Sequence, residues 1–194
     1  MMMRAEVVSR APHARKHGTT FAESWRSADG ATLVAVGAVL AGDDPVIVSD
    51  LLRTGARALV TSRKALGVAL GALDRVVQKH AHEHRDDELA AAVLLLAFAP
   101  DGNDLDAAGA GQLHAALIDG SGNQHPIHGR AGALGTGIEP KDLIESLHLR
   151  RDDIVVAATV PIDPEWWNAG NRTAEALLHH SAAHDASVAL VSIG

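Results

Sequence analysis

Apolar residues in this chain follow a strand-like spacing in some segments and a helix-like spacing in others. Residues 21–25 and 32–39 are strand-like runs, and residues 27–30 between them end in an Asp-Gly pair. Such a pair suits the positive φ of a hairpin turn. Residues 5–8 form a further short run that we interpret as an edge strand. We therefore expect a hairpin and one edge strand near the start of the chain.

Two helices are predicted after this hairpin. Asp44 and Pro45 provide an N-cap and a first-turn proline, and apolar residues then recur at helical spacing as far as residue 62. A second stripe of apolar residues at helical spacing covers residues 64–84.

Strand signals return after residue 86. Apolar runs at residues 88–98, 105–108 and 112–119 are separated by turns, so we expect them to be antiparallel neighbours. The remaining segments are interpreted as a flexible glycine-rich loop at 129–137, a short helical or irregular segment at 142–147, a buried strand at 153–160, a helix at 171–183 and a closing strand at 186–193. This order favours an α+β layered sandwich over alternating βαβ units.

Composition narrows the class of protein. The 194 residues are 47% hydrophobic and 3% aromatic, so the core is expected to consist of Ala, Val, Leu and Ile. A formal charge of -7 argues against nucleic acid or an anionic membrane as a partner. The chain has no cysteine, which excludes disulfides and thiolate chemistry. Its longest apolar run, residues 90–99, is too short to span a bilayer, and we expect a cytoplasmic protein.

Five segments, in this order, match the local signatures of one protein family. They are residues 18–21, 36–42, 110–114 together with 134–135, 158–161 and 184–188. Their order and spacing resemble the metal-dependent protein serine/threonine phosphatases of type 2C (PPM), especially the compact bacterial branch of sporulation and stress-response sigma-factor circuits. The resemblance covers residues 18–194 as one phosphatase-like domain, preceded by a strand and linker at 1–17. It implies a four-layer α-β-β-α sandwich of two antiparallel sheets flanked by helices.

The resemblance also implies where a catalytic metal site belongs. In that family, aspartates at four of these places hold two Mn²⁺ or Mg²⁺ ions, which activate a water to attack the phosphoryl group. The corresponding residues here are Thr19, Ala38, Val160 and His184, and none of them is a carboxylate. Two adjacent dications repel one another and need carboxylates around them. We therefore expect a pseudophosphatase with no catalytic residues and no metal cofactor.

Several residues near the changed positions are weak candidates for relocated metal ligands. They are Asp43, Asp44, Asp163, Asp185, His180 and His184. We interpret Asp44 as a helix cap and Asp163 as part of a turn, and one carboxylate at Asp185 does not make a two-metal site. The alternative is an active phosphoserine/phosphothreonine phosphatase in which such ligands bind Mn²⁺ or Mg²⁺.

Trp166 and Trp167 are adjacent in a chain that has three tryptophans in all. Tryptophan is enriched at interface hot spots, so the pair could anchor a protein partner, and packing in the core under a helix is the other interpretation. The resemblance implies a phosphorylated anti-sigma antagonist or a stressosome-like protein as the partner. A homodimer with this pair in its interface is a third hypothesis.

Overall fold

The computed structural model describes residues 2–10, 18–127, 132–137, 144–162, 172–180 and 185–194. These residues form two antiparallel sheets of five strands each. The first sheet has the spatial order β1 (Met3–Arg10), β10 (Ala186–Ile193), β9 (Ile154–Ala158), β6 (His114–Ile118) and β7 (Gln124–Pro126). The second has the order β2 (Thr20–Arg26), β3 (Thr32–Ala41), β4 (Ala90–Phe98), β5 (Asp104–Ala110) and β8 (Ile144–His148).

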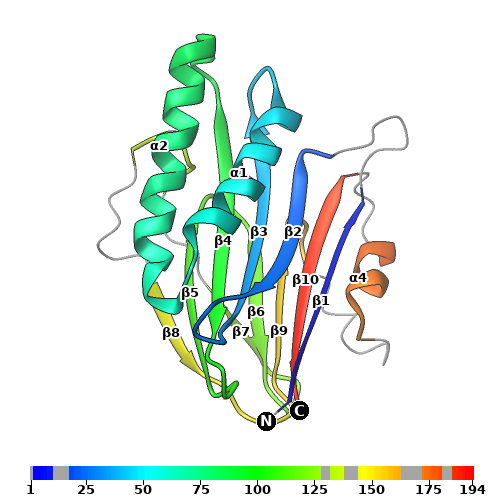
Figure 1. The fold of residues 1–194 in the computed structure, drawn as a ribbon. Helices are drawn as coiled ribbons and strands as arrows, with labels where there is room; N and C mark the ends of the chain where they lie inside the picture. Colours follow the sequence, from blue (N-terminus) through cyan, green and yellow to red (C-terminus); the bar gives the residue numbers. More distant parts are fainter. Residues whose placement is uncertain (1, 11–17, 128–131, 138–143, 163–171, 181–184) are drawn as a thin grey trace.

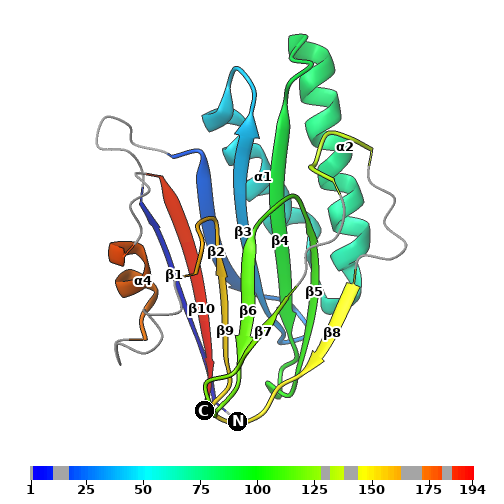
Figure 2. The same ribbon diagram turned by 180° about the vertical axis from the view of Figure 1, so that it is seen from behind.

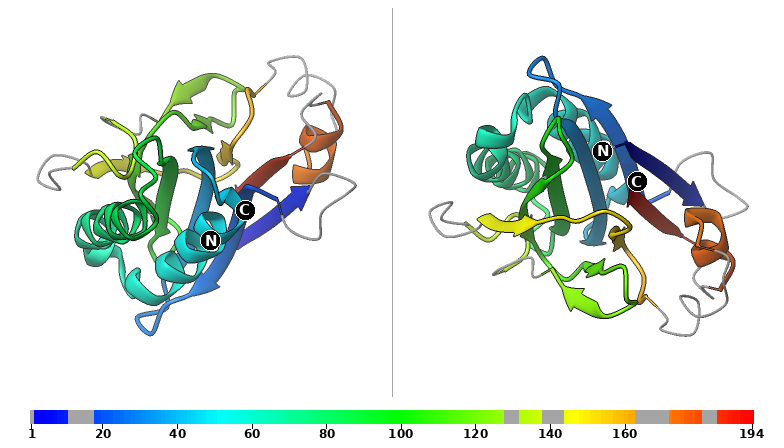
Figure 3. Two further views of the ribbon diagram at one scale, coloured as in Figure 1. Left: turned by 90° about the horizontal axis from the view of Figure 1, so that it is seen from above. Right: turned by 90° about the horizontal axis from the view of Figure 1, so that it is seen from below.

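Helices cover the outer faces of both sheets. The second sheet carries α1 (Pro45–Leu59), the 3-10 turn η1 (Arg63–Ala65) and α2 (Leu66–His84), and the first carries α4 (Ala174–His180) against β10 and β1 (Figures 1 and 3). The result is a four-layer α-β-β-α sandwich, which confirms the predicted fold class. Within the described residues, no helix is both long and apolar enough to cross a membrane.

Three layers of aliphatic side chains hold the sandwich together. Val36, Leu96 and Val155 belong to the cluster between the two sheets. A second cluster lies under α1 and α2, and a third, smaller one lies under α4. The largest fully buried side chains are leucines together with Phe98 and Ile118. Burial of this kind stabilises a fold by roughly 25 cal/mol per Å² of apolar surface.

The first and last strands, β1 and β10, pair with each other along their whole length. All eight residues of β1 are in antiparallel register with β10, from Met3 opposite Ile193 to Arg10 opposite Ala186. The two termini therefore lie close together at one end of the molecule (Figures 1 and 2). The predicted edge strand near the start of the chain belongs to the first sheet, at its edge.

The predicted hairpin and both long helices are present. Gly30 has a φ of +82° in the turn between β2 and β3, as the Asp-Gly pair required. Pro45 is the first residue of α1, but Asp44 at the N-cap makes no hydrogen bond through its side chain. Its backbone carbonyl accepts a bond from Val48 N instead, at 3.1 Å. Asp44 is therefore the N-cap of α1, as predicted, and it acts through its backbone rather than its side chain.

Two strand predictions need correction. The run at 112–119 is not a neighbour of β5, because after Gly111, with a φ of +80°, the chain crosses to the first sheet and β6 pairs with β9 and β7. The segment predicted as helical or irregular at 142–147 contains β8, which pairs with β5. Its residues alternate between exposed and half-buried, as in an edge strand with one face in solvent.

The glycine-rich loop is packed rather than flexible where it is described. Leu134 is fully buried, and its N–H donates to Ala91 O at 2.8 Å. The next N–H, of Gly135, donates to the buried Asp74 carboxylate on α2 at 2.7 Å. Residues 132–137 are thus attached to both β4 and α2.

Leu134 should make a large contribution to stability. We expect Leu134→Ala to lower the free energy of unfolding by about 2–5 kcal/mol, because the truncation leaves a cavity in a well-packed layer. Leu40→Ala is the matched control, since Leu40 is 51% exposed, and it should change this free energy by less than about 0.5 kcal/mol. Urea denaturation followed by circular dichroism measures both, and equal effects would contradict the packed loop.

Candidate functional site at the edge where the two sheets meet

The carboxylate of Asp185 lies between the start of β10 and the residues that lead into β2. The backbone N–H of Thr19 donates to its Oδ2, and the Thr19 hydroxyl donates to the same oxygen at 2.8 Å. The Thr20 hydroxyl donates to Oδ1 at 2.7 Å. Both oxygens of Asp185, which precedes β10 of the first sheet, therefore accept hydrogen bonds from residues before and at the start of β2 in the second sheet.

A chain of hydroxyl groups continues from this carboxylate. Thr20 Oγ1 lies 2.9 Å from Ser187 Oγ on β10, which lies 2.8 Å from Ser9 Oγ on β1. Ser9 Oγ in turn accepts a bond from the N–H of Ala22 on β2, at 3.1 Å. We call Asp185, Thr19, Thr20, Ser187 and Ser9 the hydroxyl network. This network connects β1 and β10 of the first sheet to β2 of the second sheet.

The four positions that correspond to the family's metal ligands are not all in one place. Thr19 is in the hydroxyl network, and Ala38 on β3 is in register with Thr20. Val160 packs among the buried aliphatic side chains under α4. His184 lies outside the described residues. The structure therefore brings Thr19 and Ala38 close to Asp185 and places Val160 in a separate apolar cluster.

The other candidate ligands lie elsewhere or outside the described residues. The N–H of Asp43 donates to the buried carboxylate of Asp86 at 2.8 Å, so the backbone of Asp43 holds the loop before α1, and its own side chain is exposed. His180 is the last residue of α4. The predictions for Asp163, Trp166 and Trp167 concern residues outside the described ranges.

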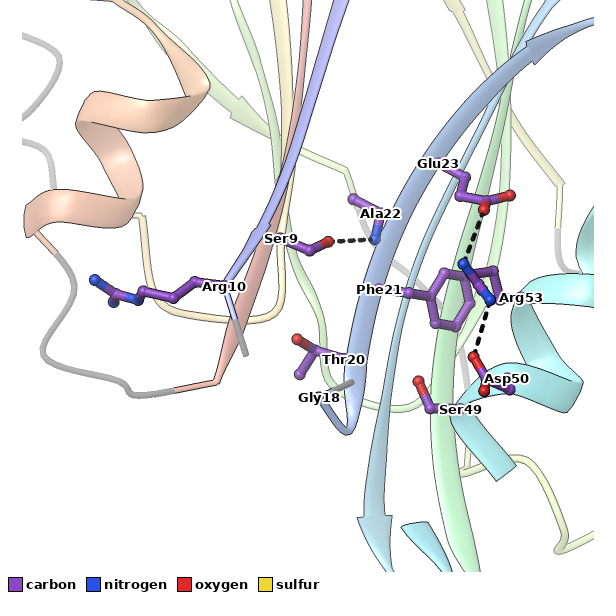
Figure 4. Close-up of a pocket in the computed structure, with 10 residues that line it drawn as sticks. All are labelled: Ser9, Arg10, Gly18, Thr20, Phe21, Ala22, Glu23, Ser49, Asp50 and Arg53. Carbon is purple, nitrogen blue, oxygen red and sulfur yellow. Dashed lines mark hydrogen bonds and ion pairs between the residues drawn. The ribbon is translucent and has the colours of Figure 1, made fainter. Parts of the chain in front are cut away.

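A cavity of about 320 Å³ opens beside the hydroxyl network (Figure 4). Ser9, Thr20 and Phe21 from the edge strands line one side, and Ser49, Asp50 and Arg53 from α1 line the other. The Arg53 guanidinium lies 3.5 Å from Glu23 and 3.0 Å from Asp50, so its charge is balanced by two carboxylates. These groups are suited to hydrogen-bonding a polar segment of a partner.

The groups that could act as metal ligands at this site do not fit a pair of divalent cations. Mn²⁺ and Mg²⁺ prefer several carboxylate oxygens, but both oxygens of Asp185 already accept hydrogen bonds and Ala38 provides only a methyl group. Within the ranges that the structure describes, no group of three or more His, Cys, Asp or Glu residues is arranged to hold a metal ion. The described residues of this site therefore do not provide the ligands that a two-metal catalytic step needs.

Sequence reasoning found Asp185 and Thr19 but missed the serines of the network. Ser187 stands in the mostly apolar strand β10 and is fully buried, whereas Ser9 is exposed and stands in β1, half of whose residues are polar. The N–H of Ser187 also donates to Thr159 Oγ1 at 2.9 Å. Since a buried hydroxyl needs a partner, a serine inside an apolar strand was the available signal.

Removal of the Asp185 carboxylate should loosen this edge. We expect Asp185→Ala to lower the free energy of unfolding by about 2–3 kcal/mol, because it leaves donors on Thr19 and Thr20 without their acceptor. Asp43→Ala removes a carboxylate that is exposed and should have little effect. Chemical denaturation of both variants measures the difference, and an unchanged midpoint for Asp185→Ala would show that the network contributes little.

Solved structures with the same fold are numerous. The S. agalactiae serine/threonine phosphatase superimposes with a TM-score of 0.82 at 12% identity, with full coverage of both chains. A protein of the bacterial stressosome gives 0.74 at 15% identity, covering 98% of this chain and 99% of that one. RsbX in complex with magnesium gives 0.78 at 11% identity, covering 99% and 96%. These likenesses concern the fold.

The family follows from a sequence comparison. No curated protein matches this chain significantly. The family model described as Stage II sporulation protein E (SpoIIE) matches residues 41–187, well over half of the chain. With the sandwich fold already established, the chain belongs to the SpoIIE family of bacterial type 2C phosphatase-like domains.

Proposed function

We propose that this chain is a pseudophosphatase, a type 2C phosphatase-like domain that binds a phosphoprotein or regulatory protein without hydrolysing phosphate. The observation that carries the proposal is the hydroxyl network, in which Thr19 and Thr20 hold the Asp185 carboxylate and Thr20 is in register with Ala38 on β3. By the resemblance, Thr19 and Ala38 stand where the family has metal-binding aspartates.

The chemistry of the network supports this proposal. Metal phosphatases keep several carboxylates close together because two dications neutralise their repulsion. Here one carboxylate remains, and uncharged hydroxyls with a backbone N–H stabilise it. On this proposal the edge needs no cation, because the site has too few carboxylates to hold the two metal ions that would activate a water.

A protein partner is consistent with the family. One relative belongs to the bacterial stressosome, and the matching family model is that of a sporulation protein. We propose a phosphorylated anti-sigma antagonist or a stressosome-like protein as the partner of this chain in the cytoplasm. Trp166 and Trp167 remain the proposed anchor residues for that contact.

The alternative function is an active metal-dependent phosphatase with relocated ligands. Two observations favour it: Asp185 keeps a carboxylate at the edge of the sheets, and RsbX, which has the same fold, binds magnesium. In this alternative, a cation would have to displace the Thr19 and Thr20 hydroxyls from Asp185.

Metal binding and turnover separate the two functions. We expect calorimetric titration with Mn²⁺ or Mg²⁺ to give no saturable heat at millimolar metal, and we expect no hydrolysis of para-nitrophenyl phosphate or of a phosphoserine peptide. An active bacterial 2C phosphatase serves as the positive control. Metal-dependent turnover that is lost in Asp185→Asn would contradict the pseudophosphatase and establish the alternative.

Restoring one aspartate should not restore activity. Ala38→Asp puts a second carboxylate beside Asp185 at a position that is 8% exposed, so we expect it to destabilise the fold by about 1–3 kcal/mol. It should give no turnover with Mn²⁺, because two carboxylates cannot balance two dications. Ala38→Ser is the uncharged control. Mn²⁺-dependent hydrolysis by Ala38→Asp would mean that a partial metal site has survived.

A further inference from the structure

Helix α1 carries a stripe of exposed side chains on the face opposite the core. Ile47, Leu51, Thr54 and Ala58 recur at intervals of four, three and four residues, which places them on one side of the helix. All four are exposed, with an exposed fraction of 53% for Ile47 and 38% for Leu51. We call these four residues the α1 stripe. Helix α1 itself lies on the outer layer of the sandwich, beside α2 (Figures 1 and 3).

We propose that the α1 stripe is the contact surface of a homodimer, in which α1 packs antiparallel against α1 of a second copy around a two-fold axis. Contiguous apolar side chains on the outside of a helix mark an interaction site, and a two-fold interface uses the same patch on both copies. This proposal does not rest on the pseudophosphatase function, because the stripe faces away from the core and includes no residue of the hydroxyl network.

Two charged residues beside the stripe favour the antiparallel orientation of the second copy. Asp50 and Arg57 lie seven residues apart, two helical turns, on the same flank of the stripe. With the two-fold axis between Leu51 and Thr54, Asp50 lies within about 3 Å along the helix axis of Arg57 of the second copy. The symmetry repeats this pair, so the antiparallel dimer gains two opposite-charge contacts. A parallel two-fold dimer would put these flanks on opposite sides of the interface, so it would gain neither contact.

Both charged groups can reach a second copy. The side chain of Asp50 is 47% exposed, and that of Arg57 is 64% exposed. Their contacts within the chain are at the surface: Asp50 lies 3.0 Å from Arg53, and Arg57 lies 3.9 Å from Glu23. Exposed pairs of this kind are weak and exchange partners readily.

The side chains of the stripe suit close packing. Thr54 and Ala58 are small and would face Leu51 and Ile47 of the second copy, so large and small residues alternate across the contact. One helix of 15 residues buries less surface than the roughly 800 Å² per partner of a standard interface. We therefore expect a weak dimer, with a dissociation constant of about 100 µM.

Sedimentation equilibrium from 5 to 500 µM measures this association. We expect the wild type to change from monomer to dimer over this range and Leu51→Glu to stay monomeric. Val68→Glu is the matched control, since Val68 on α2 is 72% exposed and outside the stripe, and it should dimerise like the wild type. A wild type that is monomeric at 500 µM would overturn the proposal, as would equal association of Leu51→Glu and Val68→Glu.

The antiparallel orientation can be tested with two variants that invert the charge of Asp50 and of Arg57 separately. Asp50→Arg places two like-charge pairs across the interface, and so does Arg57→Asp, so each alone should weaken the dimer by about tenfold. An equimolar mixture of the two restores opposite charges at both contacts and should associate at least as well as the wild type. The mixture contains the same folded chains as the separate samples, so a folding defect cannot produce the rescue. Dimerisation of the wild type without rescue in the mixture would overturn the antiparallel arrangement.

Discussion

The bonds between Asp185 and the two threonines before and at the start of β2 determine how this edge of the sandwich is closed. Asp185 and Thr19 are 166 residues apart in the sequence, and they immediately precede β10 and β2, which belong to different sheets. A single charged group with three donors joins them, and Ser187 and Ser9 extend the contact to β10 and β1. Charge-assisted hydrogen bonds are stronger than neutral ones, so a few residues are enough to close this edge.

If Thr19 and Ala38 stand in place of metal-binding aspartates, as we propose, this constraint explains how the fold remains stable without them. Clustered carboxylates without a cation would repel one another, whereas one carboxylate among hydroxyls is stable. Thr19 and Ala38 are uncharged, and the hydroxyls of Thr19 and Thr20 donate hydrogen bonds to the Asp185 carboxylate. Val160 completes an apolar cluster under α4, which a charged side chain would disrupt. The sequence changes are therefore consistent with a sandwich that is stable without metal.

Local patterns predicted most of the fold. The Asp-Gly turn before β3, Pro45 at the start of α1 and the apolar run of β10 each specify their own conformation through neighbouring residues. The errors concern long-range pairing. β8 has no continuous apolar run, and it exists because β5 offers it an edge. The transfer of β6 to the first sheet depends on the chain direction after Gly111, which no short pattern encodes.

At the site, the proposal that Thr19 and Ala38 replace metal-binding aspartates comes from the resemblance, whereas the hydrogen-bond partners of Asp185 come from the structure. Thr19, Ala38 and Asp185 stand in recognisable signatures, whereas Ser9 and Ser187 become partners only when β1 and β10 lie beside β2. Asp44 is the N-cap of α1 as its place before Pro45 predicted, but its side chain makes no capping bond, because the propensity of a residue type does not fix the direction of its side chain.

The central claim is that the Asp185 edge is closed by hydroxyl donors and does not accept a divalent cation. Paramagnetic broadening by Mn²⁺ in the amide spectrum of the folded protein tests it most directly. If the edge accepts no divalent cation, the amide signals of Thr19, Thr20 and Ala38 stay as sharp in millimolar Mn²⁺ as that of Gly102, which lies in a distant turn. Selective broadening of Thr19, Ala38 and Asp185 would contradict the account, because it would place a bound ion at this edge.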